Sequence, residues 1–263
     1  MSQDSANGAT SSTAIGKTLA VLETLAVHQR LSAIAEATGL PKSTVHRILR
    51  SLTEHGFARA ASDGRYLPGP RILSIAGQIL STFDYTLQLG PALRGLQTRT
   101  GFTVHFAVLT GLEAVYVEKL ENEDKPYRMA SRVGMRLRLH CTGIGKAILA
   151  ALPPEEAERL LAEAGMEART PNTITSAEAM SAELERVRGR GFAIDDEENE
   201  ETTRCVAAAV LDHRGRVFGG ISVSSLAFLM SYQDAERLGP TVVEAAAAIS
   251  EALGAPRGAG VAG

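Results

Sequence analysis

The sequence has few features that would place the protein in a membrane or in an oxidising compartment. Two cysteines, Cys141 and Cys205, in 263 residues do not make a disulfide framework. No apolar run reaches the length of a membrane span. Residues 1–12 are polar and lack the basic-then-apolar order of a secretory signal. We therefore expect a cytoplasmic protein that makes no contact with a membrane.

The chain also has little net charge, −3 at pH 7, which by itself argues weakly against a nucleic-acid partner. The charge is unevenly distributed, however. Residues 14–69 hold seven Lys and Arg against four acids, a net charge of +3, so the remaining residues carry −6. This division suits a basic DNA-binding module joined to an acidic partner domain. At 44% hydrophobic residues, the chain is long enough for two domains.

Residues 39–51 (GLPKSTVHRILRS) predict a turn that leads into a short helix. Gly39 suits the turn, Pro41 suits a first helical position, and Ser43 or Thr44 can hydrogen-bond the start of the helix. Apolar residues recur at spacings of three and four, which predicts one buried face. These apolar residues are Val45, Ile48, Leu49 and Leu52.

Two more helices are expected before this turn. Residues 31–38 predict a short helix that packs against the one after the turn. Residues 15–27 predict a first helix on which the other two can pack, with an apolar face made of Ile15, Leu19, Leu22 and Leu25. A helix, a glycine-containing turn and a second helix form the helix-turn-helix arrangement that binds DNA.

The polar faces of the helix after the turn carry hydrogen-bond donors. The residues expected at the DNA are Lys42, Ser43, Thr44, His46, Arg47 and Arg50. Ser43, Thr44 and Arg47 are the best candidates for base edges or phosphate, and Lys42 suits phosphate. Arg50 could equally be a solvated charge. The plainer alternative for the whole stretch is an ordinary amphipathic surface helix.

A short hairpin is expected to follow. Residues 57–60 and 65–67 read as two strands around a turn at residues 62–64, in the position of a wing. Arg65 lies near its tip, where it can contact phosphate or the minor groove and so position the protein more than select a sequence.

The rest of the chain predicts a mixture of helices and hairpin-connected strands. Residues 71–89 predict a strongly apolar helix that links domains or dimerises. Further helices are expected from about residue 93 and over residues 143–152, 154–164, 176–190 and 232–253. Strands are expected at residues 104–108, 115–117, 127–131, 136–139, 192–194, 205–211 and 217–224. The fold class is therefore α+β, with a mixed α/β domain after the linker.

Several stretches together resemble the IclR family of bacterial transcriptional regulators, over about residues 14–253. They are residues 40–47 (LPKSTVHR), 64–71 (GRYLPGPR), 132–140 (RVGMRLRLH), 142–147 (TGIGKA), 195–200 (DDEENE), 204–208 (RCVAA) and 222–224 (SVS). Their order and spacing are more specific than any single stretch.

This resemblance implies an N-terminal winged helix-turn-helix, a linker helix and a C-terminal domain similar to GAF-type sensors of small molecules. The expected boundaries are a disordered tail over residues 1–13, a DNA-binding domain over 14–70, a linker over 71–89, an effector-binding domain over 90–253 and a disordered tail over 254–263. Family members bind operators as dimers or dimers of dimers, and a small organic or aromatic acid changes that binding. The expected partners are therefore double-stranded operator DNA and a carboxylate effector that controls a metabolic operon.

The family's ligand site maps onto residues whose chemistry suits a carboxylate. Gly143, Ile144 and Gly145 lie where a strand turns into a helix, so backbone N–H groups and the helix dipole can hold an anion. Ser222 and Ser224 alternate on a strand and present two hydroxyls to one face. The full set of expected effector contacts is Met129, Leu139, Gly143, Ile144, Asp195, Cys205, Ser222 and Ser224.

Other chemistry has less support. Residues 143–147 lack the first Gly and the final Ser or Thr of a nucleotide-binding loop. Cys141 and Cys205 could form a metal or nucleophile site with His105 or His140, but zinc-type spacing is missing. Neither a metal nor another cofactor is expected. A regulator that senses redox state through these cysteines, or a Cys205-dependent enzyme, remains open as an alternative to a non-enzymatic effector sensor.

Overall fold

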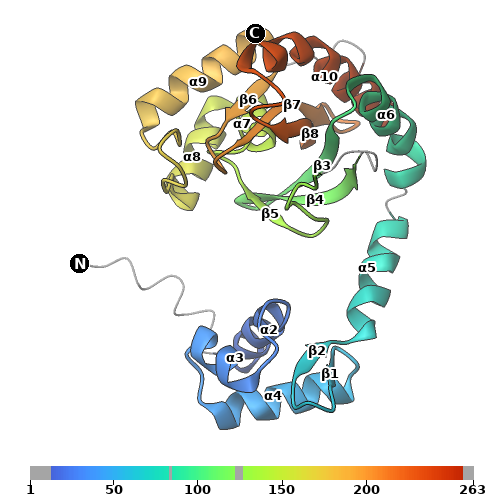
Figure 1. The fold of residues 1–263 in the computed structure, drawn as a ribbon, viewed down its shortest axis with the longest axis vertical. Coiled ribbons are helices and arrows are strands. Elements are labelled where there is room, and N and C mark those ends of the chain that lie inside the picture. Colours follow the sequence, from blue (N-terminus) through green and yellow to red (C-terminus); the bar gives the residue numbers. More distant parts are fainter. Residues whose placement is uncertain (1–12, 83–84, 122–126, 257–263) are drawn as a thin grey trace. The chain divides into compact units, whose positions relative to one another are not determined.

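The computed structural model describes residues 13–82, 85–121 and 127–256. The chain divides after residue 84 into two compact units, coloured along the chain in Figure 1. Residues 1–12 and 257–263, which make up most of the two expected tails, lie outside the described residues.

The N-terminal unit contains the expected helix-turn-helix and wing. Its elements are α2 (Ala14–Leu25), α3 (Leu31–Thr38), α4 (Lys42–Glu54), β1 (Ala58–Ala60), β2 (Tyr66–Pro68) and α5 (Pro70–Thr82). Gly39 ends α3 with a φ of 66°, the left-handed conformation that glycine adopts without strain. Val45, Ile48, Leu49 and Leu52 of α4 are all buried, as their spacing predicted.

Two details of these helices differ from expectation. Pro41 precedes α4, and the N–H groups of Thr44 and Val45 bond to its carbonyl, so no Ser43 or Thr44 side chain caps the helix. The buried face of α2 includes Val21 and Leu25, whereas Ile15 and Leu19 are 74% and 53% exposed. The reason is that the three-helix core covers only the C-terminal half of α2.

The linker helix expected over residues 71–89 includes residues 83–84, which lie outside the described residues. The structure has α5, which ends at Thr82, and α6 (Tyr85–Thr100), which opens the C-terminal unit and continues through Pro91. Leu89, Leu93 and Leu96 explain the continuity, because they lie on one face of α6 and are all buried in the core of that unit.

The C-terminal unit is built on a six-stranded antiparallel sheet in the order β5-β4-β3-β8-β7-β6. The strands are β3 (Thr103–Thr110), β4 (Glu113–Leu120), β5 (Arg136–Arg138), β6 (Ala193–Asp196), β7 (Thr203–Leu211) and β8 (Val217–Leu226). The other helices are α7 (Gly143–Ala151), α8 (Pro154–Ala164), α9 (Ala177–Arg190) and α10 (Tyr232–Ala252). Figure 1 shows α6 and α10 on one side of the sheet and α7 to α9 on the other.

The two-residue period of the strands places different chemistry on the two faces of the sheet. Val104, Phe106, Ile221 and Val223 belong to the core beneath α6 and α10. The residues between them on β3 and β8 therefore face the α7 side, where they include polar side chains.

The strand expected at residues 127–131 does not form. Side chains satisfy the backbone of this segment instead. The Lys119 ammonium donates to the carbonyls of Met129 and Ser131, and the Met129 N–H donates to the Glu121 carboxylate. The side chains of Lys119 and Glu121 thus hold this irregular segment beside β4.

Candidate functional site

The exposed side of α4 carries most of the polar residues expected at the DNA. Lys42, Ser43, His46, Arg47 and Arg50 are exposed, and Thr44 is half-buried. The Arg50 guanidinium lies 3.0 Å from the Glu54 carboxylate, with both side chains in solvent. Such a pair is weak, but it gives Arg50 a local partner, so Arg47 is the better-placed arginine for a base edge or a phosphate.

Arg65 lies beside the wing turn and is held in place. Its guanidinium contacts Asp63 at 2.6 Å and the Gln29 side chain at 2.8 Å. The hydrogen bonds from Arg65 lower the pKa of the Asp63 carboxyl. Arg59, which was not among the predicted contacts, is exposed on β1 of the same hairpin, so the wing presents two arginines.

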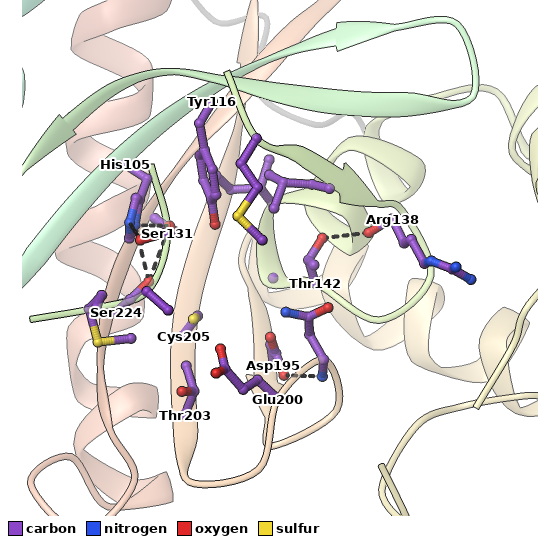
Figure 2. A pocket seen from close by; sticks show the side chains of 18 of the residues that line it. His105, Tyr116, Ser131, Arg138, Thr142, Asp195, Glu200, Thr203, Cys205 and Ser224 are labelled. Atoms are coloured by element: carbon purple, nitrogen blue, oxygen red, sulfur yellow. Dashed lines mark hydrogen bonds between the residues drawn. The ribbon is translucent and has the colours of Figure 1, made fainter. Parts of the chain in front are cut away.

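The C-terminal unit contains a cavity of about 330 Å³ between the sheet and α7 (Figure 2). Seven of the eight expected effector contacts line it: Met129, Gly143, Ile144, Asp195, Cys205, Ser222 and Ser224. Leu139 does not, because β5 ends at Arg138 and Leu139 packs into the core beneath α7. Leu137, two residues earlier on β5, lines the cavity in its place.

Other lining residues were not singled out from the sequence as effector contacts. They include His105, Tyr116, Ser131, Arg138, Thr142, Arg169, Asn199 and Glu200. Alternation on β3 could have identified His105, since it lies between Val104 and Phe106 and is paired with Ser222 across the β3–β8 ladder. Ser131 had no comparable signal, because it lies in the irregular segment.

A polar cluster forms one side of the cavity. Figure 2 shows His105, Ser131 and Ser224 together there. His105 Nε2 lies 2.8 Å from Ser131 Oγ, and Nδ1 lies 3.3 Å from Ser224 Oγ and 3.5 Å from Ser222 Oγ. Burial lowers the pKa of His105 to about 3, and the Lys119 charge acts in the same direction. A neutral imidazole therefore orients these hydroxyls, with one ring nitrogen as donor and the other as acceptor.

Asp195 contributes a buried carboxyl at the end of β6. Its Oδ1 accepts hydrogen bonds from the backbone N–H of Glu198 at 2.8 Å and of Asn199 at 3.3 Å. Burial, and then the nearby Glu198 charge, raises the pKa of Asp195 to about 7. The carboxyl is therefore only partly ionised in neutral solution, and its protonated form can donate a hydrogen bond to an anionic ligand.

The start of α7 presents backbone donors to the same cavity. Gly145 N–H is already bonded to the Thr142 side chain, and Lys146 N–H to the Thr142 carbonyl. The N–H groups of Gly143 and Ile144 find no acceptor among the described residues. Two donors therefore remain at the positive end of the helix dipole, which is a ready site for an anion.

The glycines at the start of α7 also allow the helix to pack closely against its neighbours. A Cβ on Gly145 would come within 2.3 Å of the Leu139 carbonyl oxygen, and one on Gly143 within 3.2 Å of the Ala207 Cβ. Gly143 and Gly145 thus allow the start of α7 to approach β7 and the preceding turn.

The cysteines are poorly suited to thiolate chemistry. Burial raises the pKa of Cys141 to about 12 and raises that of Cys205 as well, with a further contribution from Asp195 in each case. A protonated thiol is a weak nucleophile and a weak metal ligand. The described residues also bring together no group of three His, Cys, Asp or Glu side chains that could hold a metal.

Comparison with known proteins follows the same division of the chain. The IclR helix-turn-helix domain matches residues 14–62, and the family description "Bacterial transcriptional regulator IclR C-terminal" matches residues 77–251. The HTH-type transcriptional regulator XynR of Escherichia coli is 34% identical over 232 residues, which cover 88% of this chain and 92% of XynR. The transcriptional repressor IclR of the same organism is 31% identical over 230 residues, 86% of this chain and 84% of the repressor.

Solved structures agree. The crystal structure of Thermotoga maritima IclR has a TM-score of 0.72 and 33% identity, and the match covers 91% of this chain and 98% of that one. A winged helix-turn-helix joined to a domain with an internal polar cavity defines a DNA-binding transcriptional regulator. The chain belongs to the IclR family, whose members bind operator DNA and a small-molecule effector. In the part of the chain that the structure describes, no helix combines the length and apolar character of a bilayer span.

Proposed function

We propose that this protein is a homo-oligomeric regulator that binds a pseudo-palindromic operator through α4 and the wing and senses a small carboxylate in the cavity of its C-terminal unit. The observation that carries the proposal is that Gly143 and Ile144, whose N–H groups have no acceptor among the described residues, line a polar cavity at the start of α7. Operator binding requires the compartment that holds the DNA, so the protein acts in the bacterial cytoplasm.

The cavity supplies complementary groups for a hydroxylated or carbonyl-bearing acid. The ligand carboxylate takes the N–H groups at the start of α7. Ser222 and Ser224, both 2% exposed, offer hydroxyls to a second polar group. The side chains of Met129 and Leu137 form an apolar part of the cavity wall. The volume of about 330 Å³ leaves room for an aliphatic or an aromatic acid.

One relative indicates which aromatic acid to test. An IclR homologue from Microbacterium hydrocarbonoxydans was solved as a complex with 4-hydroxybenzoate, and its TM-score to this chain is 0.77 at 24% identity. This likeness concerns the fold, so 4-hydroxybenzoate enters the panel as one candidate among several.

The effector alters DNA binding by favouring one arrangement of the DNA-binding units in the oligomer. Differential affinity of the effector for two arrangements is what such a switch requires. Leu73 and Ile75 on α5 are 76% and 39% exposed, and these apolar side chains suit contact with a second copy. The control of a metabolic operon fits relatives such as the acetate operon repressor of Salmonella typhimurium, 30% identical over 230 residues.

The proposal makes the cavity a sensor and not a catalytic centre. Raised pKa values leave Cys141 and Cys205 protonated at neutral pH, and His105 is too weak a base to activate either thiol. These properties also weigh against thiol-based redox sensing.

A thermal-shift panel of acetate, succinate, benzoate and 4-hydroxybenzoate tests the proposal, followed by calorimetric titration and operator gel shifts with each acid that binds. For succinate and 4-hydroxybenzoate, which carry a second polar group, the double change Ser222→Ala/Ser224→Ala should weaken binding at least about tenfold, the loss of one to two hydrogen bonds to that group. Ser225→Ala is the matched control, since Ser225 is buried on the same strand but does not line the cavity. Equal losses in both variants, or no carboxylate that alters the melting temperature, would contradict the proposal.

A further inference from the structure

A lysine is buried behind the cavity, where it takes no part in the ligand contacts proposed above. Lys146 lies on α7 and its side chain is 1% exposed. Its ammonium forms a short ion pair with Glu198 Oε1 and lies 3.4 Å from Glu183 Oε1. Lysine is almost never fully buried unless it is paired, and well-packed apolar residues often stabilise such a position more. Because burying the Lys146 ammonium is costly, the next question is which segment its ion pair with Glu198 holds in place.

Glu198 belongs to the turn between β6 and β7, residues 197–202, which forms part of the cavity wall. Its backbone N–H bonds to the Asp195 carboxylate at 2.8 Å, and the next residue, Asn199, bonds to the same oxygen at 3.3 Å. Asn199 and Glu200 both line the cavity. The conformation of the turn therefore decides where Asp195 and Asn199 present their polar atoms.

Two residues of this turn have backbone conformations that are unfavourable for residues other than glycine. Glu197 and Thr202 have φ values of 59° and 63°, in the left-handed region that is uncommon for residues other than glycine. On its outer side, the hydroxyls of Thr170 and Thr173 donate to the carbonyls of Glu197 and Glu198, both at 2.6 Å. On its inner side, the Glu198 carboxylate meets Lys146.

The Glu198 side chain is attached on this side through its ion pair with Lys146. Glu198 Oε2 is buried and has no hydrogen-bond partner in the described part of the chain. Lys146 is the cation paired with this carboxylate. By contrast, Glu183 on α9 has two further partners, Arg186 at 2.8 Å and Arg190 at 3.3 Å.

We propose that Lys146 is a positioning residue of the effector site: through its ion pair with Glu198 it holds the turn at residues 197–202 so that Asp195 and Asn199 face the cavity. The part that concerns effector recognition rests on the proposed function. The mechanical part, which is the dependence of the turn on Lys146, stands on the contacts alone and can be tested without a ligand.

Hydrogen exchange of the full-length protein tests the mechanical part, read by mass spectrometry on peptides that resolve residues 197–200. Lys146→Met keeps the length of the side chain and removes its charge, and Glu198→Gln removes the charge of its partner. Both variants should exchange the amides of Glu198 and Asn199 at least about tenfold faster than the wild type, because local opening exposes bonded N–H groups.

Glu183→Gln is the matched control. It removes a carboxylate from the same buried cluster, but Glu183 lies on α9, and its hydrogen bonds within the described part of the chain are with Lys146, Arg186 and Arg190. It should lower the melting temperature while leaving exchange at residues 197–200 within about twofold of the wild type. If Lys146→Met fails to fold, the comparison of Glu198→Gln with Glu183→Gln still decides the question. Equal acceleration in those two variants, or none in Glu198→Gln, would show that the cluster only stabilises the domain.

A second readout distinguishes positioning from general loosening. The ¹³C signal of the Asp195 carboxyl reports its titration, and the charged or titratable groups around it are Lys146, Glu198, Glu200, Cys141, Cys205 and Tyr116. Loss of the Lys146 charge should raise the pKa of Asp195, and loss of the Glu198 charge should lower it. Shifts of the same sign in both variants would overturn the proposal. If a carboxylate from the panel binds the wild type, its affinity should fall in both variants but not in Glu183→Gln.

Discussion

The two units of this chain present their functional side chains in opposite ways. On α4, Lys42, His46 and Arg47 face solvent, while the packing of the helix depends on other residues. In the C-terminal unit, Asp195 and Ser222 are 3% and 2% exposed, so the side chains proposed to contact an effector are also part of the interior. An outward-facing site can change without loss of stability, whereas an inward-facing site couples recognition to folding.

The largest expected effect is a loss of stability at the inward-facing site, with no effect on the outward-facing site of α4. In Gly145→Ala, the new Cβ would lie 2.3 Å from the Leu139 carbonyl oxygen, and backbone atoms cannot move aside cheaply. We expect a loss of about 3 kcal/mol or more in the stability of the C-terminal unit, measured by denaturant unfolding. Gly95→Ala in α6 is the control, since its Cβ meets nothing within 4 Å. Equal stability of the two variants would show that the start of α7 has room to shift.

The next effect belongs to the outward-facing site. Arg47→Ala should weaken operator binding by about 1–3 kcal/mol, roughly five- to 150-fold, if Arg47 contacts a base edge. The melting temperature should stay unchanged, because Arg47 is exposed. Gel shifts measure the affinity, and Arg50→Ala is the control, with a smaller loss expected because Arg50 is paired with Glu54. An unchanged affinity in Arg47→Ala would place the recognition surface elsewhere.

A third prediction concerns the pH dependence of stability that the buried carboxyl of Asp195 should produce and the exposed residues of α4 should not. The pKa of Asp195 rises from 3.8 to about 7 on folding, so the folded state holds a proton that the unfolded state releases. The contribution of Asp195 to stability should therefore fall as the pH rises from about 4 through 7, while His105, whose pKa is lowered on folding, contributes in the opposite direction. Asp195→Asn keeps an oxygen for the N–H groups of Glu198 and Asn199 but cannot ionise. Its stability relative to the wild type should rise by more than about 1.4 kcal/mol, one pKa unit, between pH 4 and pH 8.

Thermal unfolding of both proteins across that pH range measures this difference. A constant difference between wild type and Asp195→Asn would mean that Asp195 titrates near its ordinary pKa and that its carboxyl is better solvated than its burial indicates. The outward-facing site serves as the internal comparison, because Arg47→Ala should leave the melting temperature unchanged across the same pH range.

The contrast also explains which residues the sequence could predict. Periodicity alone identified all four buried apolar positions of α4. The polar residues at the other positions were therefore expected on its exposed face. In the C-terminal unit, family resemblance identified seven residues that line the cavity, whereas Leu139 lies in the core, because the end of β5 depends on tertiary packing. His105 lies at the cavity because β3 pairs with β8, and Ser131 lies there because the Lys119 ammonium bonds to its carbonyl. Both contacts join residues that are far apart in the sequence.

Packing also overrode local signals in two helices. Pro91 lies within α6 because Leu89, Leu93 and Leu96 bury one continuous face, although proline ordinarily interrupts a helix. Ile15 and Leu19 have helical spacing with Leu22 and Leu25, yet they remain exposed because the small core ends before them. Spacing predicts that a face exists, and the neighbouring elements determine how much of it is covered.

The smallest expected effect concerns the wing, where an exposed arginine already has local partners. Arg65→Ala should weaken operator binding only about threefold and reduce the slope of log affinity against log salt by about one, as expected for one phosphate contact. Asp63→Asn sharpens the test, because it frees Arg65 from its 2.6 Å ion pair and should strengthen binding slightly. Opposite signs in the two variants, read from gel shifts at several salt concentrations, would assign a phosphate contact to Arg65. The same sign in both would indicate that the Asp63–Arg65 pair instead shapes the turn, and the wing would then resemble the buried site in coupling recognition to local structure.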